Sequence, residues 1–336
     1  MSTQTMKAVR LHAFGGPDVL RYEDAPMPAP GPGEVLVRVH AAGVNPPDWY
    51  LRDGYRTLPP DWRPAVSLPA IPGSDVSGVV AAVAADVRDF AVGDAVFGML
   101  RFPSFGDSAA YAEYVAAPAT DLAHKPAGID HVTAAAAPMA ALTAWQFLVD
   151  PGHAQPNPFQ AHPHRPLPLA GRTVLVNGAA GGVGHLAVQL AKREGARVIA
   201  VASGGHGAFL RAIGADAHID YTQDDPAAVR GVDLVLDTVG GPAASRFLPT
   251  LAPGGALYLV YPLGFAGHEQ ARELGVTVSA AQVRSNGAQL AQIARLLEDG
   301  TLRVAIDSTF ALADAASAHA RAARGHLRGK IVLAVS

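Results

Sequence analysis

The chain has 336 residues, which is enough for about two domains of ordinary size. Its 26 basic and 29 acidic residues give a formal net charge of -3, a balance that argues against nucleic acid or an anionic membrane as a partner. The sequence contains no cysteine, which excludes disulfides, thiolate nucleophiles and cysteine-ligated zinc. It also begins without an apolar stretch of signal-peptide length, so we expect a cytoplasmic protein.

Residues 6–127 are rich in short β-prone runs. The runs KAVRL, EVLVRVHAAGV, SGVVAAV, DAVFGML and AAYAEYVAAP are separated by turn signals such as GGPD, PAPGPGE and VGD. This pattern predicts a compact, irregular β domain.

An uncharged run follows at residues 132–149, and it is long enough to cross a bilayer. Most of its residues are alanine, which contributes little transfer free energy, and Pro138 lies in its middle. Thr133, Thr143 and Gln146 are polar. We therefore predict a buried helix at a domain junction in place of a membrane span.

From about residue 128 to residue 283, strand-like and helix-like segments alternate. The strand-like runs are TVLVN, RVIAVA, VDLVLDTV and ALYLVY, and helices are expected at 183–194 and 207–213. Alternation at this spacing predicts a parallel sheet with crossover helices. The tail after residue 284 reads as helix, strand, helix and strand, and it either extends this second domain or returns to the first.

Residues 151–170 form an unusually long connection that is rich in proline and histidine. His162 and His164 flank one proline and offer nitrogen ligands to a metal ion, but no acid or cysteine accompanies them. We interpret the segment as a solvated surface loop.

The stretch VLVNGAAGGVGHLAVQLAK, residues 174–192, has a strand pattern, a glycine turn and an amphipathic helix pattern in that order. Glycine residues allow backbone N–H groups to approach an anion, and the start of the following helix adds partial positive charge. The motif is AxGxxG at 179–184, with alanine in place of the usual first glycine, and its context favours a dinucleotide site over a purely structural turn. We predict that the pyrophosphate is bound by Ala180, Gly181, Gly182, Val183 and Gly184.

The end of the next strand predicts which dinucleotide is bound. NAD sites place a carboxylate there for the ribose 2′-hydroxyl, but no acid occurs between Arg197 and Asp216. Ser203 and His206 could instead bind a 2′-phosphate, although His206 could equally be an ordinary exposed histidine. The absence of an acid favours NADPH as the cofactor.

Taken together, these motifs resemble the medium-chain dehydrogenase/reductase superfamily, and within it the zinc-free quinone oxidoreductase (zeta-crystallin-like) branch. The supporting stretches include GPGEVLVRVHAAGVNPPDWYLRDG, IPGSDVSGVV, the glycine turn, IGADAHIDY, VLDTVGG and GHLRGKIVLAV. The resemblance implies an α/β protein in which residues 1–127 and 284–336 form a GroES-like β-rich catalytic domain. It further implies a Rossmann domain at 128–283, a doubly wound parallel sheet, with the active site in the cleft between the two.

The resemblance also bears on metal binding. Zinc alcohol dehydrogenases of this superfamily have a cysteine where this chain has Asn45, and a His-Glu pair where it has Ser74 and Asp75. We therefore predict no metal, and a hydride transfer in which hydrogen bonds stabilise the developing negative charge. Quinones and α,β-unsaturated carbonyl compounds suit such a site because conjugation spreads that charge.

Site residues follow from the same resemblance. Asn45 is expected to donate a hydrogen bond to the substrate oxygen, and Tyr50 to line the pocket or supply a proton; a turn cap at Asn45 and simple packing at Tyr50 are the alternatives. Thr143 is expected near the nicotinamide and Tyr221 near the 2′-phosphate; a threonine that bonds its own helical turn and a tyrosine packed in the core are the alternatives. The backbone around Val260 ends a parallel strand, where the ligand crevice of such sheets opens.

Other functions and the assembly stay open at this point. An enoyl-thioester reductase of secondary metabolism is one alternative, and a non-catalytic, crystallin-like NADPH-binding protein is another. Members of this branch usually form a homodimer through an edge strand, which here would be residues 276–283. Two features depart from the family: no lysine or arginine stands near His206, and the insertion at 151–170 replaces a very short connection, where it would shape either an oligomer contact or the rim of the cleft.

Overall fold

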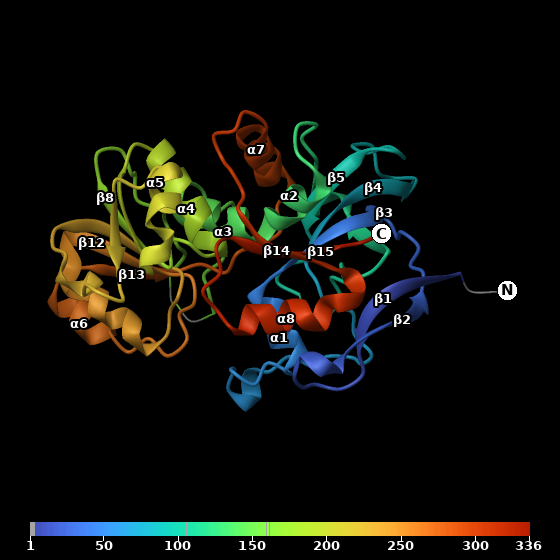
Figure 1. Cartoon of the computed structure of the whole chain (residues 1–336), viewed down its shortest axis with the longest axis horizontal. Coiled ribbons are helices and arrows are strands. Elements are labelled where there is room, and N and C mark those ends of the chain that lie inside the picture. The colour runs from blue at the N-terminus through green and yellow to red at the C-terminus, as the bar shows by residue number, and fades with distance from the viewer. Residues whose placement is uncertain (1–3, 105, 159, 161) are drawn as a thin grey trace. The chain divides into compact units, whose positions relative to one another are not determined.

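The computed structural model describes every residue except 1–3, 105, 159 and 161, and the chain folds into two compact units (Figure 1). The first unit contains the described residues up to Leu142, together with Arg284–Gly300 and Val304–Ser336. The second contains the described part of Thr143–Val283 and the short segment Thr301–Arg303. Most of the C-terminal tail, for which the sequence left two alternatives, is therefore part of the first unit.

The first unit is built on a seven-stranded sheet with the order β14-β15-β3-β4-β5-β7, in which β6 also pairs with β3. Its strands are β3 (Glu34–Val44), β4 (Asp75–Val83), β5 (Ala95–Met99), β6 (Tyr114–Pro118), β7 (Leu122–His124), β14 (Ile306–Ala311) and β15 (Lys330–Ala334). A separate antiparallel pair consists of β1 (Thr5–Leu11) and β2 (Leu20–Pro26). The helices are α1 (Pro46–Arg52), α2 (His131–Ala136), α7 (Gly287–Glu298) and α8 (Ala315–Ala323).

Three strand ends of this sheet meet because β4 and β15 both run antiparallel to β3. Near the end of β3, Gly43 pairs with Asp75 at the start of β4, and Val44 pairs with Ile331 near the start of β15. Residues at these strand ends are therefore neighbours in space, although they are far apart in the sequence.

The second unit contains a six-stranded, entirely parallel sheet with the order β10-β9-β8-β11-β12-β13. Its strands are β8 (Thr173–Asn177), β9 (Arg197–Ala202), β10 (Ala217–Asp220), β11 (Val232–Asp237), β12 (Leu251–Leu259) and β13 (Thr277–Ala280). Its helices are α4 (Gly182–Arg193), α5 (Gly207–Ala212) and α6 (His268–Glu273). The strand order reverses between β8 and β11, which is the arrangement of a doubly wound nucleotide-binding sheet. The predicted fold class is confirmed.

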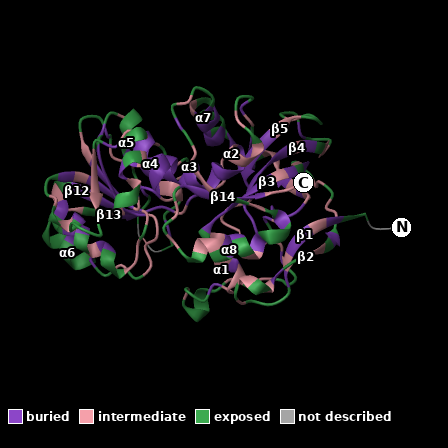
Figure 2. Cartoon of the chain, in the orientation of Figure 1, coloured by how far each residue is buried: buried purple, intermediate pink, exposed green. Residues whose placement is uncertain are grey.

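Buried residues concentrate along the central strands of both sheets, whereas α6 carries mostly exposed residues (Figure 2). Val35 and Val37 of β3 are fully buried in the first unit, and Val174, Leu175 and Val176 of β8 are fully buried in the second. The continuous apolar run of β8 is typical of a parallel strand that is covered on both faces. These central strands hold in place the loops that follow them.

The uncharged run at residues 132–149 forms two buried helices where the sequence predicted one. The helix α2 ends at Ala136, and α3 (Pro138–Leu148) begins with the proline and carries the chain from the first unit into the second. Proline lacks an N–H group, so it is favoured at the start of a helix and interrupts a longer one. Among the described residues, no helix has the length and apolar character needed to span a membrane.

The described part of residues 151–170, which we call the strap, lies along the β12 and β13 edge of the second sheet. The buried His164 makes two hydrogen bonds, one with Oγ of Ser279 in β13 at 2.8 Å and one with the carbonyl oxygen of Phe147 in the preceding helix at 2.9 Å. The interpretation of this segment as a solvated loop is wrong for His164, because both imidazole nitrogens find partners in the folded unit. His162 is exposed, as expected.

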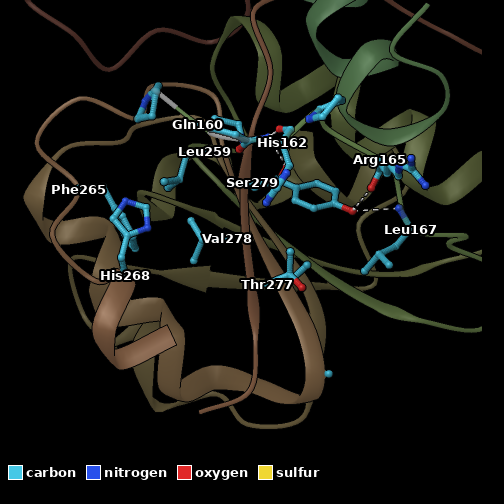
Figure 3. A pocket seen from close by; sticks show the side chains of 16 residues that line it. Gln160, His162, Arg165, Leu167, Leu259, Phe265, His268, Thr277, Val278 and Ser279 are labelled. Atoms are coloured by element: carbon cyan, nitrogen blue, oxygen red, sulfur yellow. Dashed lines mark hydrogen bonds between the residues drawn. The ribbon is translucent and has the colours of Figure 1, made fainter. Parts of the chain in front are cut away.

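Two further contacts attach the strap to the sheet. The side-chain oxygen of Gln160 accepts a hydrogen bond from the backbone N–H of Ala280 in β13. The Tyr258 hydroxyl of β12 donates to the carbonyl oxygen of Arg165 at 3.1 Å and accepts from the N–H of Leu167 at 2.9 Å, as the dashed lines in Figure 3 show. The strap therefore satisfies part of the open hydrogen-bonding edge of β13.

Candidate active site

The predicted phosphate-binding turn connects β8 to α4 in the second unit. Gly178 has φ of 75°, a left-handed conformation that reverses the chain directly after the strand. Gly181 is the N-cap of α4, and no side chain caps that helix end. The first N–H groups of an α-helix have no acceptor within the helix, so those of Gly182, Val183 and Gly184 are available to a bound anion.

Gly184 is required by the close packing of this turn. A Cβ atom at Gly184 would lie 2.2 Å from the carbonyl oxygen of Gly178 and 2.7 Å from Cα of Ala179. Such distances are shorter than any normal contact, so only glycine lets the helix start directly against the turn. This geometry fits the diphosphate of a nicotinamide dinucleotide.

The adenosine end of such a nucleotide is expected where β9 ends, at Ser203. There the chain forms a short helical turn, Gly204–His206, before α5. The parallel pairing of Asp220 with Ala202 brings the end of β10 alongside, so that Tyr221, which is 44% exposed, lies on the neighbouring strand end. The structure thus places Ser203, His206 and Tyr221 around the same pair of strand ends.

Sequence reasoning missed two charged residues at this end of the sheet. A Cβ atom on Gly204 would lie 2.3 Å from Oδ2 of Asp220, so a carboxylate does approach the end of β9, from the next strand. A Cβ atom on Gly207 would lie 3.5 Å from Nη1 of Arg211, so a guanidinium approaches as well, from one turn further along α5. The strand pairing and the helix period supply these neighbours, and a search of the loop sequence alone cannot find them.

In the first unit, the three strand ends bring Asn45, Asp75 and Lys330 together. Nδ2 of Asn45 donates to Oδ2 of Asp75 at 2.9 Å, and Oδ1 of Asn45 accepts from the ammonium group of Lys330. The Lys330 nitrogen lies 3.8 Å from Oδ2 of Asp75, and the two side chains are 4% and 0% exposed. A side chain on Gly43 would collide with Cβ of Asp75 at 2.9 Å, so glycine at that position permits this approach.

Burial dominates the electrostatics of this group. It raises the pKa of Asp75 to about 6, against the opposing effects of Lys330, Asn45 and the backbone N–H of Met139. Burial also lowers the pKa of Lys330, against the attraction of Asp75 and Asp48. The site therefore contains a buried ammonium and a buried carboxylate, and the charge of each group is compensated by the other.

The helix α1 starts directly after Asn45, which acts as its N-cap in a capping box. The backbone N–H of Asn45 donates to Oδ2 of Asp48 at 2.7 Å, so the Asp48 carboxylate accepts a hydrogen bond from the backbone at the start of its own helix. Tyr50 lies on the same helix, is half-buried and meets Trp49 edge-on at a centroid distance of 6.2 Å. The two residues predicted to be catalytic are thus held by one short helix and its cap.

The side chain of Asn45 is 2% exposed, and its second amide hydrogen is directed toward the carbonyl oxygen of Gly43 at 3.5 Å. That contact is at the outer limit of a hydrogen bond. It is therefore the weakest of the contacts made by the amide group and the one most easily exchanged for another acceptor.

The groups that replace the zinc ligands do not suit zinc. The amide of Asn45 and the carboxylate of Asp75 lie beside the ammonium group of Lys330, and a divalent cation would be repelled by that ammonium. Among the residues that the structure describes, no group of three histidine, cysteine, aspartate or glutamate side chains is arranged to hold a metal ion.

The remaining predicted residues lie in the second unit. Thr143 is buried in α3, and Val260 follows β12 with its N–H bonded to the carbonyl oxygen of Asp237 at 3.0 Å. A pocket of about 870 Å³ opens beside β12 and β13 and is lined partly by the strap (Figure 3). Its lining includes no residue of the glycine turn, so this pocket is separate from the phosphate-binding site.

Comparison with known proteins agrees with this arrangement. Residues 31–127 match the family described as alcohol dehydrogenase GroES-like domain, and residues 213–333 match the family described as zinc-binding dehydrogenase. The chain is 32% identical to the chloroplastic quinone oxidoreductase QR1 of Triphysaria versicolor over 99% of both chains. It is 31% identical to a human quinone oxidoreductase, covering 98% of this chain and 97% of the human protein.

Solved structures give the same result. The quinone oxidoreductase of Coxiella burnetii superimposes with a TM-score of 0.85 at 33% identity, over 99% of this chain and all of the other. A quinone oxidoreductase of Pseudomonas syringae superimposes with a TM-score of 0.81 at 30% identity, over 98% and 99% of the two chains.

Proposed function

Because the chain belongs to the medium-chain dehydrogenase/reductase superfamily, in its quinone oxidoreductase branch, we propose that it is a zinc-independent reductase that transfers hydride from NADPH to a quinone or an α,β-unsaturated carbonyl compound. The observation that carries the proposal is the combination of an uncapped helix start behind a tight glycine turn with an ammonium-containing site that is unsuited to zinc. The bound nicotinamide supplies the hydride.

The second unit binds the nucleotide in this proposal. The N–H groups of Gly182, Val183 and Gly184 hold the diphosphate, and the absence of a side chain at Gly184 lets the helix start directly against the turn. Thr143 and Val260 contact the nicotinamide end, and Ser203, His206 and Tyr221 contact the adenosine end.

The choice of NADPH depends on two opposing charges. The guanidinium of Arg211 would attract a 2′-phosphate, whereas the carboxylate of Asp220 would repel it. Asp220 already accepts hydrogen bonds from the N–H of Thr222 at 3.0 Å and from its hydroxyl at 2.7 Å, which engage Oδ1 within the chain. These hydrogen bonds lower the pKa of Asp220 and keep its carboxylate charged. We assign the 2′-phosphate to Arg211 together with Ser203 and His206, whose attraction has to outweigh that repulsion.

The first unit stabilises the reduced acceptor in this proposal. The ammonium of Lys330 polarises the amide of Asn45, which makes its N–H groups stronger donors. The hydrogen that is directed toward Gly43 makes only a long contact, at 3.5 Å, and in this proposal it is shared with the substrate oxygen as negative charge develops there. Tyr50, one turn further along the helix that Asn45 caps, lines the substrate site in this proposal and can supply a proton.

Steady-state oxidation of NADPH tests the proposed reaction. Turnover is expected with 1,4-benzoquinone, 9,10-phenanthrenequinone or a simple enone, and replacing Asn45 with alanine should lower kcat. Failure of every such acceptor would refute the reductase proposal. Turnover of crotonyl thioester in their place would assign an enoyl-thioester reductase, and saturable NADPH binding without any turnover would assign a non-catalytic binding protein.

Fluorescence titration with NADPH and NADH tests the cofactor assignment. Replacing Arg211 with glutamine should weaken NADPH binding by about tenfold, which corresponds to the loss of one charge-assisted contact, and leave NADH binding unchanged. Arg230→Gln is a matched control, because Arg230 is an exposed arginine of the same unit that bonds the carbonyl oxygen of Ala227. Equal effects on both nucleotides would contradict the role of Arg211.

A further inference from the structure

Four side chains of the first unit form a continuous hydrogen-bonded chain that the proposed reaction does not use. Nη1 of Arg52 lies 3.0 Å from Nδ1 of His319, Nε2 of His319 lies 3.3 Å from the Tyr111 hydroxyl, and that hydroxyl lies 3.0 Å from Oδ2 of Asp48. His319, Tyr111 and Asp48 are at most 2% exposed. Arg52 and Asp48 belong to α1, His319 belongs to α8, and Tyr111 precedes β6.

Chemistry allows only one direction for each link of this chain. Arginine only donates, so Nδ1 of His319 must accept and the imidazole is neutral. Its single hydrogen is then on Nε2, which donates to the oxygen of Tyr111, and the hydroxyl hydrogen of Tyr111 donates to the carboxylate of Asp48. Burial lowers the pKa of His319 to about 3, which keeps the imidazole in this neutral form.

The chain holds α1 at both of its ends. Asp48 lies in the first turn, where the same oxygen that receives the Tyr111 hydrogen bond also accepts from the N–H of Asn45 at 2.7 Å. Arg52 is the last residue of the helix. Both ends of α1 are therefore connected to His319 by hydrogen bonds. This helix carries Tyr50, and it begins directly after Asn45.

We propose that His319 is a positioning residue, which acts through Tyr111 and Asp48 to hold Asn45 and Tyr50 in the geometry that hydride transfer requires. The catalytic part of this inference rests on the function proposed above. A residue that misplaces a catalytic group by about 1 Å can lower the rate by about a hundredfold without touching the substrate.

The ionisation of Asp48 links this chain to pH. Burial raises the pKa of Asp48 to about 7, and the hydrogen bonds from Asn45 and Tyr111 hold it down. The other charged groups that face it are Asp75, which raises the pKa, and Lys330, which lowers it. Tyr55, another neighbour, keeps its proton because burial raises the pKa of its hydroxyl. Loss of the Tyr111 hydroxyl should therefore raise the pKa of Asp48 further.

Kinetics of three variants test the inference. Tyr111→Phe and His319→Leu should lower kcat by about 10- to 100-fold with little change in the KM for NADPH, because the phosphate-binding turn belongs to the other unit. His319→Gln should retain most of the rate, because glutamine can both accept from Arg52 and donate to Tyr111. Tyr114→Phe is the matched control: Tyr114 follows Tyr111 by three residues and is half-buried, and its hydroxyl is not part of the chain.

The pH profile distinguishes positioning from a general loss of structure. In Tyr111→Phe the acid limb of the kcat profile should move to higher pH than in the wild type, and in Tyr114→Phe it should not move. A loss of kcat that is the same at every pH, or one accompanied by weaker NADPH binding, would overturn the inference.

Hydrogen exchange of the α1 backbone, measured by mass spectrometry without substrate, separates this inference from the proposed reaction. His319→Leu should increase exchange across Pro46–Arg52, and His319→Gln should increase it less. If the wild type turns over no acceptor but this pattern appears, the reductase proposal fails while the control of α1 by His319 stands. Unchanged exchange in His319→Leu would overturn the positioning role itself.

Discussion

Replacing Lys330 with methionine should destabilise the first unit strongly and in a pH-dependent way. The Lys330 ammonium lies 3.8 Å from the Asp75 carboxylate, and both side chains are almost completely buried. Two unit charges at that distance interact by about 4 kcal/mol at an effective dielectric constant of about 20. Removing one member of a buried pair typically costs about 3–5 kcal/mol, because the other charge remains without compensation.

The sign of the pH dependence follows from the raised pKa of the Asp75 carboxyl group. Its pKa is raised in the fold, from an ordinary value of 3.8 to about 6, and loss of Lys330 would raise it further. A carboxyl whose pKa is higher in the folded than in the unfolded state favours folding at low pH, and this contribution is lost as the pH rises through the folded pKa. The variant should therefore lose stability as the pH rises from about 4 through the raised pKa of Asp75, and its deficit at pH 5 should be smaller than at pH 8.

Urea unfolding at pH 5 and pH 8 measures both effects. The two units can unfold separately, so the transition should be followed by hydrogen exchange of peptides from β3, β4 and β15. Asp75→Asn in the Lys330→Met background should recover much of the loss, since it removes the isolated charge and keeps a hydrogen-bonding partner for Asn45.

A surface ion pair provides the control for this experiment. Lys7 lies 3.1 Å from Asp24, with side chains 43% and 64% exposed. Lys7→Met should change the free energy of unfolding by less than about 1 kcal/mol at either pH. If Lys330→Met costs no more than Lys7→Met, or if its cost is the same at pH 5 and pH 8, the account of a mutually dependent buried pair is refuted.

Three other outcomes are expected. Gly184→Ala should abolish measurable NADPH binding in a fluorescence titration, because the added Cβ would lie 2.2 Å from the carbonyl oxygen of Gly178, and wild-type affinity would show that the turn is not the phosphate site. Gln160→Ala should leave the N–H of Ala280 without its acceptor and lower stability by about 1 kcal/mol, with faster exchange at that amide; equal protection in both proteins would contradict the strap contact. Acid unfolding should be shallower in His319→Gln than in the wild type. The pKa of His319 is lowered from 6.5 to about 3, so the unfolded wild-type chain takes up a proton first and the fold loses stability as the pH falls from about 6.5 to about 3; identical acid transitions would rule this out.

The parts of the molecule that depend on local sequence could be predicted. The glycine turn, the strand before it and the helix after it lie within 174–192, and their geometry follows from residue type and periodicity. Asn45 and Tyr50 could be singled out only because NPPDWY resembles a family motif, and the structure shows what that motif does locally: it starts a helix with a capping box.

Groups brought together by strand pairing could not be predicted in the same way. Lys330 reaches Asn45 across 285 positions of sequence, and His319 reaches Arg52 across 267. Asp220 approaches Gly204 because β10 runs beside β9. The strap appeared solvated because its composition is polar and rich in proline, but composition does not show that a strand edge and a helix elsewhere in the fold each offer His164 a hydrogen-bonding partner.

The late position of Lys330 has a consequence for folding during translation. Nearly all of the second unit is contiguous, from Thr143 to Val283, so its parallel sheet can close while the ribosome is still adding the remaining residues. The first unit begins earlier but is completed later, because Asn45 and Asp75 receive their ammonium partner only when β15 emerges. In the nascent chain the first unit therefore carries a carboxylate without its counter-ion and an open sheet position beside β3, and the part of the polypeptide made first is the last to become stable.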